Sequence, residues 1–144
     1  MDCLFCKIVK GDIPATILTQ CGGPEKFYPL TTQMFGNQNI IFDNASKAGQ
    51  PALQATFQLP ESQRWPKLAS QLGLIEFFAQ RGISKDQANA CLADTAATTA
   101  LVNNTNAASA EYDITGTPTF VLNGKKIDFA GWADLETKLQ ALGA

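Results

Sequence analysis

Apolar side chains recur every three or four residues along much of this chain, which is the spacing of one face of a helix. The clearest stretch runs from Ser62 to Gln80 and predicts one long helix that is closed by Gly82. Its apolar face consists of Trp65, Leu68, Ala69, Leu72, Ile75 and Ala79. The next helix is expected to begin with a capping box, in which Ser84 caps the backbone and the Gln87 side chain reaches back.

The same spacing predicts three more helices. Pro24 suits a first helical position and Gly36 suits a helix end, with Phe27, Leu30, Thr31 and Met34 at helical spacing between them. The stretch Thr95 to Glu111 predicts a helix whose inward face carries Ala97, Ala100, Leu101, Asn104 and Ala108. The last helix is expected over Trp132 to Leu142. The middle of the chain is therefore predicted to be a cluster of helices.

Three other segments have weaker patterns. Residues 3–10 are expected to form a short helix that Gly11 ends. Ala15 to Thr19 is rich in β-branched side chains, which predicts a strand. Residues 37–61 are expected to be irregular, because Pro51 and Pro60 interrupt their short apolar runs.

A hairpin is expected near the C-terminus, over Thr119 to Leu122 and Lys125 to Phe129. Asn123-Gly124 separates these two runs, and both residues tolerate the positive φ that a tight hairpin turn requires. The predicted order of elements is thus a helical cluster, a hairpin and a final helix.

The sequence Gly116-Thr117-Pro118 stands directly before this hairpin. Proline has no N–H to donate and is therefore kept to the first residue of a strand, which is its place here. In this arrangement Thr117 presents its backbone N–H and C=O to an extended partner chain. The alternative is an ordinary turn that leads into a strand.

Composition narrows the function further. A chain of 144 residues is long enough for one domain with a substantial core. The net charge of −2 gives no basic patch and argues against nucleic acid as a partner, and no apolar run is long enough to span a membrane. The chain contains no histidine, which excludes Ser-His-Asp and Cys-His catalysis and His-rich zinc sites. We expect neither a metal nor a cofactor.

The thiols carry the candidate chemistry. Cys3 and Cys6 form a Cys-x-x-Cys motif, whose spacing lets two thiols form a reducible disulfide within one helical turn. A helix N-terminus stabilises the first thiolate, so Cys3 is the candidate nucleophile and Cys6 the resolving thiol. A zinc site made from all four cysteines is not expected, because the second half of the chain lacks a paired motif.

Residues 116–124, GTPTFVLNG, resemble the cis-proline loop and last hairpin of thioredoxin-fold disulfide oxidoreductases of the DsbA-like group. The resemblance extends over residues 21–144 and includes the stretches 21–28 and 90–94. It implies an α/β, thioredoxin-like fold with a helical insertion at about 21–112, followed by the cis-proline loop, hairpin and terminal helix at 113–144. It also implies that Thr117 and Pro118 hold a cysteine-containing substrate peptide.

The resemblance lacks the usual first half of the family. There the Cys-x-x-Cys pair begins a helix after a buried strand, whereas only Met1 and Asp2 precede Cys3. The thioredoxin-like sheet is therefore expected to be incomplete. Some DsbA-like relatives carry a second cysteine pair in the helical part, which makes Cys21 and Cys91 candidates for a structural disulfide. The alternative is two free cysteines buried as small apolar side chains.

Residues 3–15, CLFCKIVKGDIPA, resemble a different family, the opening of the histidine-triad nucleotide hydrolases. Those proteins need histidines that this chain does not have, so the resemblance carries no hydrolase activity. We therefore expect a join near Thr19 to Cys21 between a histidine-triad-like segment, residues 1–20, and a DsbA-like portion, residues 21–144.

Two functions remain after these exclusions. The first is a DsbA-like thiol–disulfide oxidoreductase that exchanges disulfides with cysteine-containing protein substrates and with a redox partner protein. The alternative is a non-catalytic remnant or interaction module, which would self-associate through an exposed sheet edge. The family resemblance implies the periplasm, although the first residues lack the basic region and the long apolar stretch of a signal peptide.

Overall fold

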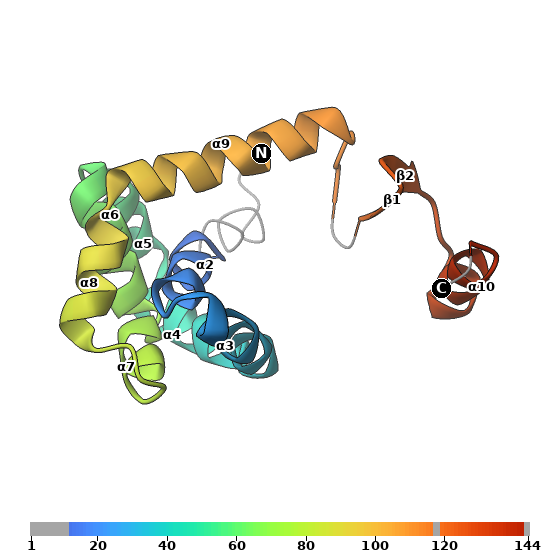
Figure 1. Ribbon diagram of the computed structural model, residues 1–144. Helices are drawn as coiled ribbons and strands as arrows, with labels where there is room; N and C mark the ends of the chain where they lie inside the picture. Colours follow the sequence, from blue (N-terminus) through green and yellow to red (C-terminus); the bar gives the residue numbers. More distant parts are fainter. Residues whose placement is uncertain (1–11, 117–118, 143–144) are drawn as a thin grey trace. The chain divides into compact units, whose positions relative to one another are not determined.

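The computed structural model describes residues 12–116 and 119–142 and divides the chain into two compact units (Figure 1). Unit 1 is Met1–Val102 and unit 2 is Asn103–Ala144. Unit 1 contains a bundle of helices, and unit 2 contains the end of one helix, a hairpin and the last helix. This order of elements is the one that the sequence predicts.

Short turns join the helices of unit 1. Their bounds are α2 Asp12–Cys21, α3 Pro24–Gly36, α4 Asn39–Ala48, α5 Gln50–Phe57, α6 Glu61–Gln71, α7 Leu74–Ala79, α8 Lys85–Ala93 and α9 Thr95–Glu111, the last of which continues into unit 2. Helix α2 contacts α3, α6, α7 and α8, and helix α6 contacts α2, α4, α5, α7 and α8, so these two helices lie in the middle of the bundle. The largest side chains that are fully buried in it are Phe78, Leu18, Leu68, Leu74, Ile83 and Leu92.

The strand expected over Ala15 to Thr19 is wrong, because these residues lie in helix α2. Ala15, Ile17 and Leu18 are all buried in the core, and Thr19 satisfies its hydroxyl by donating to the carbonyl of Thr16 at 2.7 Å. Contacts with four neighbouring helices therefore outweigh the strand preference of the β-branched side chains.

The irregular segment expected at 37–61 is also wrong, since α4 and α5 occupy most of it. The prolines do not prevent this. Pro51 stands in the first turn of α5, where a missing N–H costs nothing, and Pro60 immediately precedes α6. Gly49, with φ of 77°, makes the turn between α4 and α5. Proline here marks the starts of helices.

The single helix expected over Ser62 to Gln80 is two helices, α6 and α7, which break at Gly73. Gly73 has φ of 73°, and a Cβ placed on it would lie 2.5 Å from Nδ2 of Asn44. That Nδ2 donates to the carbonyl of Leu72 at 3.3 Å and so supports the break. The predicted apolar face is correct, because Trp65, Leu68, Ala69, Leu72 and Ile75 are buried and Ala79 is half-buried.

Side-chain caps begin α8 and α9. Ser84 accepts from the N–H of Gln87 at 3.2 Å, as the capping box predicts. The Gln87 side chain does not reach back, because it donates instead to the carbonyl of Cys21 at 3.1 Å. Asp94 accepts from the N–H groups of Ala96 and Ala97 at 3.0 and 3.1 Å and thereby caps α9.

Helix α9 has the predicted bounds but a different inward face. Ala97, Ala100 and Asn104 are exposed, Leu101 is half-buried, and Thr98 is the fully buried residue. The Thr98 hydroxyl donates to the carbonyl of Asp94 at 3.0 Å, so burial costs it no hydrogen bond. An alanine-rich sequence has no strong apolar stripe, and its inward face is therefore set by packing.

Unit 2 contains the expected hairpin and last helix. Strand β1, Phe120–Leu122, pairs antiparallel with β2, Lys125–Ile127, and Leu122 lies opposite Lys125. Asn123 and Gly124 have φ of 51° and 77°, as the two-residue turn requires. Helix α10 spans Trp132–Gln140. The described residues form no further strand, so each strand keeps one unpaired edge.

Candidate functional site

The segment that precedes the hairpin starts from a tightly closed end of α9. The N–H of Tyr112 donates to Ala108 and the N–H of Ile114 donates to Ser109, both at 3.0 Å. Asp113 stands between them with φ of 48°, in the left-handed region. The bond from Ile114 to Ser109 and the left-handed Asp113 are two features of a Schellman motif, and they set the direction in which the chain leaves the helix.

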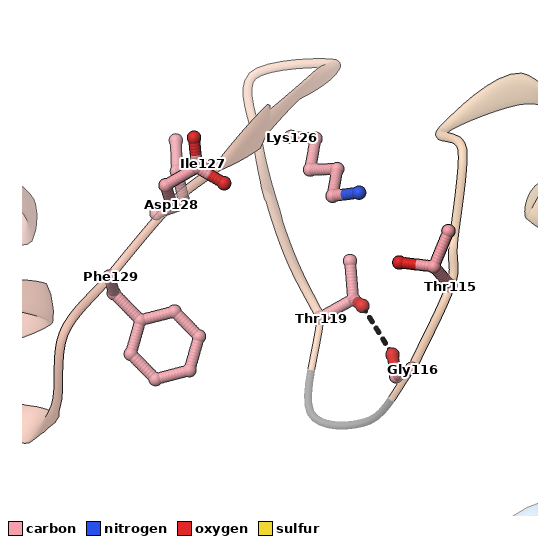
Figure 2. A pocket seen from close by; sticks show the side chains of 7 residues that line it. All are labelled: Thr115, Gly116, Thr119, Lys126, Ile127, Asp128 and Phe129. Atoms are coloured by element: carbon pink, nitrogen blue, oxygen red, sulfur yellow. Dashed lines mark hydrogen bonds between the residues drawn. The ribbon is translucent and has the colours of Figure 1, made fainter.

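A pocket of about 360 Å³ lies between this segment and β2 (Figure 2). It is lined by Thr115, Gly116, Thr119, Lys126, Ile127, Asp128 and Phe129. The Thr119 hydroxyl donates to the carbonyl of Gly116 at 2.5 Å. Two hydroxyls, one ammonium, one carboxylate and the apolar side chains of Ile127 and Phe129 therefore surround this space.

Lys126 joins the two sides of the pocket. Its Nζ donates to the backbone carbonyl of Asp113 at 2.6 Å and lies 4.0 Å from Oδ2 of the same residue. Lys126 belongs to β2, whereas Asp113 stands at the end of α9, so this contact bridges the segment and the hairpin.

The hairpin has two different faces. Phe120 lies opposite Ile127, and its ring meets that of Phe129 edge to face with centroids 4.8 Å apart. Val121 lies opposite Lys126, and these two side chains occupy the other face because successive strand residues alternate. The second face is thus the one from which Lys126 reaches the pocket.

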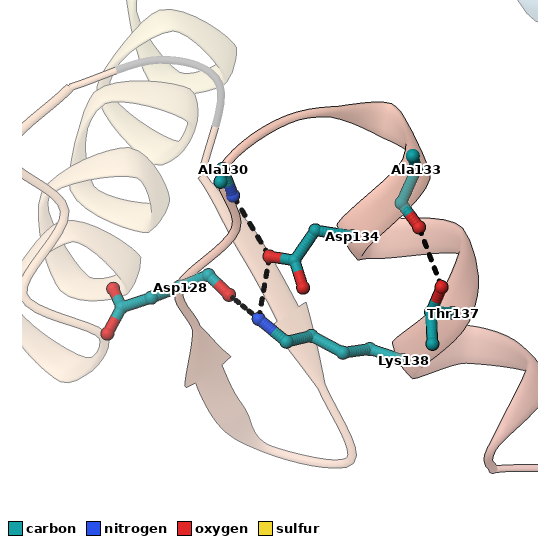
Figure 3. A network of polar contacts seen from close by, with 6 residues as sticks. All are labelled: Asp128, Ala130, Ala133, Asp134, Thr137 and Lys138. Atoms are coloured by element: carbon teal, nitrogen blue, oxygen red, sulfur yellow. Dashed lines mark hydrogen bonds and ion pairs between the residues drawn. The ribbon is translucent and has the colours of Figure 1, made fainter.

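A polar network fixes the chain between β2 and α10 (Figure 3). Lys138 donates to the carbonyl of Asp128 and to Oδ2 of Asp134, the latter at 2.9 Å. The same Oδ2 accepts from the N–H of Ala130 at 2.9 Å. The hydrogen bond from Lys138, followed by that from Ala130, lowers the pKa of Asp134 below its ordinary value. Hydrogen bonds thereby hold Asp128 and Ala130, which precede α10, against the side chains of that helix.

The described cysteines lie in unit 1. Cys21 and Cys91 form a disulfide that joins the end of α2 to α8, which is one of the two alternatives left open by the sequence. Gln87 donates to the carbonyl of Cys21 beside it, and Lys26 donates to the carbonyl of Gly82 at 3.2 Å. These contacts hold the turn between α2 and α3 against the start of α8.

The other residues singled out from the sequence lie outside the described residues. They are the candidate redox pair, Cys3 and Cys6, and the candidate peptide-binding residues, Thr117 and Pro118. The structure therefore describes the flanks of the candidate loop, Gly116 and Thr119. Sequence reasoning missed Lys126, and the available signal was its position opposite Val121 on the face shared with Thr119.

The part of the chain that the structure describes contains neither a group of metal ligands nor a helix that could span a membrane. Its cysteine and carboxylate side chains form no group suited to a metal ion. None of its helices has the length and apolar character that crossing a membrane would require.

Comparison with known proteins identifies the arrangement. A family model described as Thioredoxin matches residues 10–141. The crystal structure of protein-disulfide isomerase from Novosphingobium aromaticivorans is similar, with a TM-score of 0.82 and 25% identity, over 91% of this chain and 67% of that one. No curated protein matches the chain. The helical cluster, hairpin and final helix are therefore parts of a thioredoxin-like fold, as the sequence predicts.

Proposed function

Since the chain belongs to the thioredoxin family, we propose that it is a thiol–disulfide oxidoreductase of the DsbA-like type that acts on cysteine-containing protein segments. The observation that carries the proposal is the family match, which runs through the loop at 114–119 and the hairpin behind it. The protein-disulfide isomerase named above, whose match spans 91% of this chain, supports the same class of reaction.

The peptide-binding residues of this proposal are Thr117 and Pro118. Thr117 pairs its backbone N–H and C=O with an extended substrate, and Pro118 ends the pairing because it has no N–H. Gly116 and Thr119, which are joined by a hydrogen bond, flank this dipeptide. The adjacent pocket of about 360 Å³ offers space for a substrate side chain.

The reacting groups of this proposal are Cys3 and Cys6. The Cys3 thiolate attacks a substrate disulfide, forms a mixed disulfide and releases one substrate thiolate. The Cys6 thiolate then attacks Cys3 sulfur, which closes the Cys3–Cys6 disulfide and releases the second substrate thiol. A redox partner protein with its own dithiol or disulfide resets the pair, and the reverse sequence oxidises a substrate.

Trapping tests the assignment of the two thiols. A Cys6→Ser variant should accumulate a mixed disulfide between Cys3 and a disulfide-containing test peptide, because no resolving thiol remains. A Cys3→Ser variant should form none, and the double variant Cys21→Ala/Cys91→Ala should exchange at the wild-type rate. Full exchange activity in Cys3→Ser would refute the proposed nucleophile.

One observation favours the second candidate, a non-catalytic interaction module. In the part of the chain that the structure describes, β1 and β2 form a sheet of two strands, and each strand keeps one unpaired edge. In this version the loop binds a peptide without exchanging its disulfide, and the free edges of β1 and β2 promote self-association. Peptide binding that persists in Cys3→Ser/Cys6→Ser while wild type shows no exchange would support the module.

A further inference from the structure

One peptide group at the base of the candidate loop is held at both ends. The N–H of Ile114 donates to Ser109 at 3.0 Å, and the carbonyl of Asp113, in the same peptide group, accepts from Lys126 Nζ at 2.6 Å. Hydrogen bonds at the two ends of one amide polarise it and reinforce each other. Asp113 is thus fixed to the end of α9 from one side and to β2 from the other.

The backbone contact of Lys126 matters more than its ion pair. The Lys126 side chain is 33% exposed, whereas that of Asp113 is 91% exposed, and their charged atoms are 4.0 Å apart. Water screens an exposed pair at that separation, so its contribution is small. The bond from the ammonium to the carbonyl is short and charge-assisted, and it does not depend on which side chain residue 113 carries.

This contact joins the two chain segments that line the pocket. Thr115 and Gly116 follow Asp113 directly and line one side, while Lys126 to Phe129 line the other. The other hydrogen bond between the described residues of these two segments is the one from Thr119 to Gly116 within the loop, so without Lys126 they would be held together through the loop. The distance between the two sides would then vary.

We propose that Lys126 is a positioning residue of the peptide site: by holding the Asp113 carbonyl against β2, it fixes the opening between Thr115–Gly116 and the hairpin. The peptide part of this inference rests on the proposed function. Lys126 acts here through the backbone of the loop, and the reacting thiols are not involved. Neighbouring Lys125 belongs to the opposite face of the hairpin and provides a matched control for charge.

Two measurements on the full chain test the inference. Amide hydrogen exchange by NMR reports on the Ile114 N–H, and fluorescence anisotropy reports the affinity for a dye-labelled extended peptide that carries one S-methylated cysteine. Lys126→Met should speed exchange at Ile114 and weaken the peptide, each by roughly tenfold. Lys125→Met should change neither, and Lys126→Arg should restore both because arginine keeps a charged donor.

Asp113→Asn separates the backbone contact from the ion pair. It retains the carbonyl, so it should match the wild type in both measurements. A loss in Asp113→Asn as large as that in Lys126→Met would overturn the inference, and so would equal behaviour of Lys126→Met and Lys125→Met.

The two proposals fail in different ways. If the wild type does not bind the peptide, the proposed function and the peptide role of Lys126 fail together, whereas Ile114 exchange still decides whether Lys126 holds the loop. If the wild type binds and Lys126→Met binds equally well, only the positioning role fails.

Discussion

The Gln87 side chain donates a hydrogen bond to the backbone carbonyl of Cys21 at 3.1 Å, next to the disulfide from Cys21 to Cys91. Helix α8 is therefore attached to the end of α2 by a disulfide and by a hydrogen bond next to it. The same glutamine supplies the N–H that Ser84 caps, so one residue serves both the start of α8 and its attachment.

Loss of the disulfide should destabilise unit 1. The bond joins residues 70 positions apart, and cross-linking a loop of that size restricts the unfolded chain by about 4 kcal/mol as an upper value. Urea unfolding of Cys21→Ala/Cys91→Ala should therefore show a lower midpoint than the wild type. Reductant should lower the wild-type midpoint and leave that of the double variant unchanged. Equal midpoints for both proteins without reductant would contradict the prediction.

Gly22→Ala should destabilise the turn between α2 and α3. Its Cβ would lie 2.9 Å from Cδ1 of Ile83, whose side chain is fully buried. Overpacking of this kind costs roughly 1–3 kcal/mol. Gly36→Ala is the control, because nothing lies within 4 Å of its Cβ position. Thermal unfolding should show a lower midpoint temperature for Gly22→Ala than for Gly36→Ala. Equal midpoints would contradict the prediction and show that the turn accommodates the added Cβ.

The network around Asp134 should weaken in acid. Hydrogen bonds from Lys138 and from the Ala130 N–H hold the pKa of Asp134 below the ordinary 3.8. A carboxyl whose pKa is lower in the folded chain stabilises it fully above about pH 4, and this contribution is lost as the pH falls through the folded pKa. Carboxyl-carbon NMR should show the low pKa, and Lys138→Met should move it upward. If the pKa of Asp134 is the same in Lys138→Met as in the wild type, Lys138 is not the cause of the low pKa.

The free edge of β1 should promote self-association. Val121 lies opposite Lys126 in a non-hydrogen-bonded pair, because Leu122 and Lys125 close the two-residue turn, so the Val121 N–H points away from β2. Val121→Pro removes that donor and spares the ladder, whereas Val121→Ala keeps it. Sedimentation should show association of the wild type and of Val121→Ala, with roughly tenfold weaker association of Val121→Pro. A wild type that stays monomeric at every concentration would show that the free edge of β1 does not promote self-association.

The sequence predicts those elements whose signals are local. Pro24 and Gly36 mark both ends of α3, Ser84 caps α8, and Asn123-Gly124 makes the hairpin turn. Each of these features depends on the φ preference or capping group of one or two residues, which a sequence displays directly.

The errors concern elements that depend on distant contacts. Helix α2 is helical because four other helices surround it, and Gly73 breaks the α6–α7 stretch where Asn44 donates to Leu72. Lys126 was missed for the same reason, since its acceptor is a backbone carbonyl that no side-chain pattern reveals. The Gly-Thr-Pro sequence predicts the candidate loop, whereas the contact between Lys126 and Asp113 depends on the fold.

The bond between Cys21 and Cys91 also changes what a protease would leave behind. Lys47 is exposed near the end of α4, between the two cysteines in the sequence. A single cut after Lys47 would divide the backbone, yet both pieces would stay joined through sulfur and migrate as one species on a non-reducing gel. Only a reductant would separate the two pieces. On a non-reducing gel a cleaved chain would therefore migrate like an intact one.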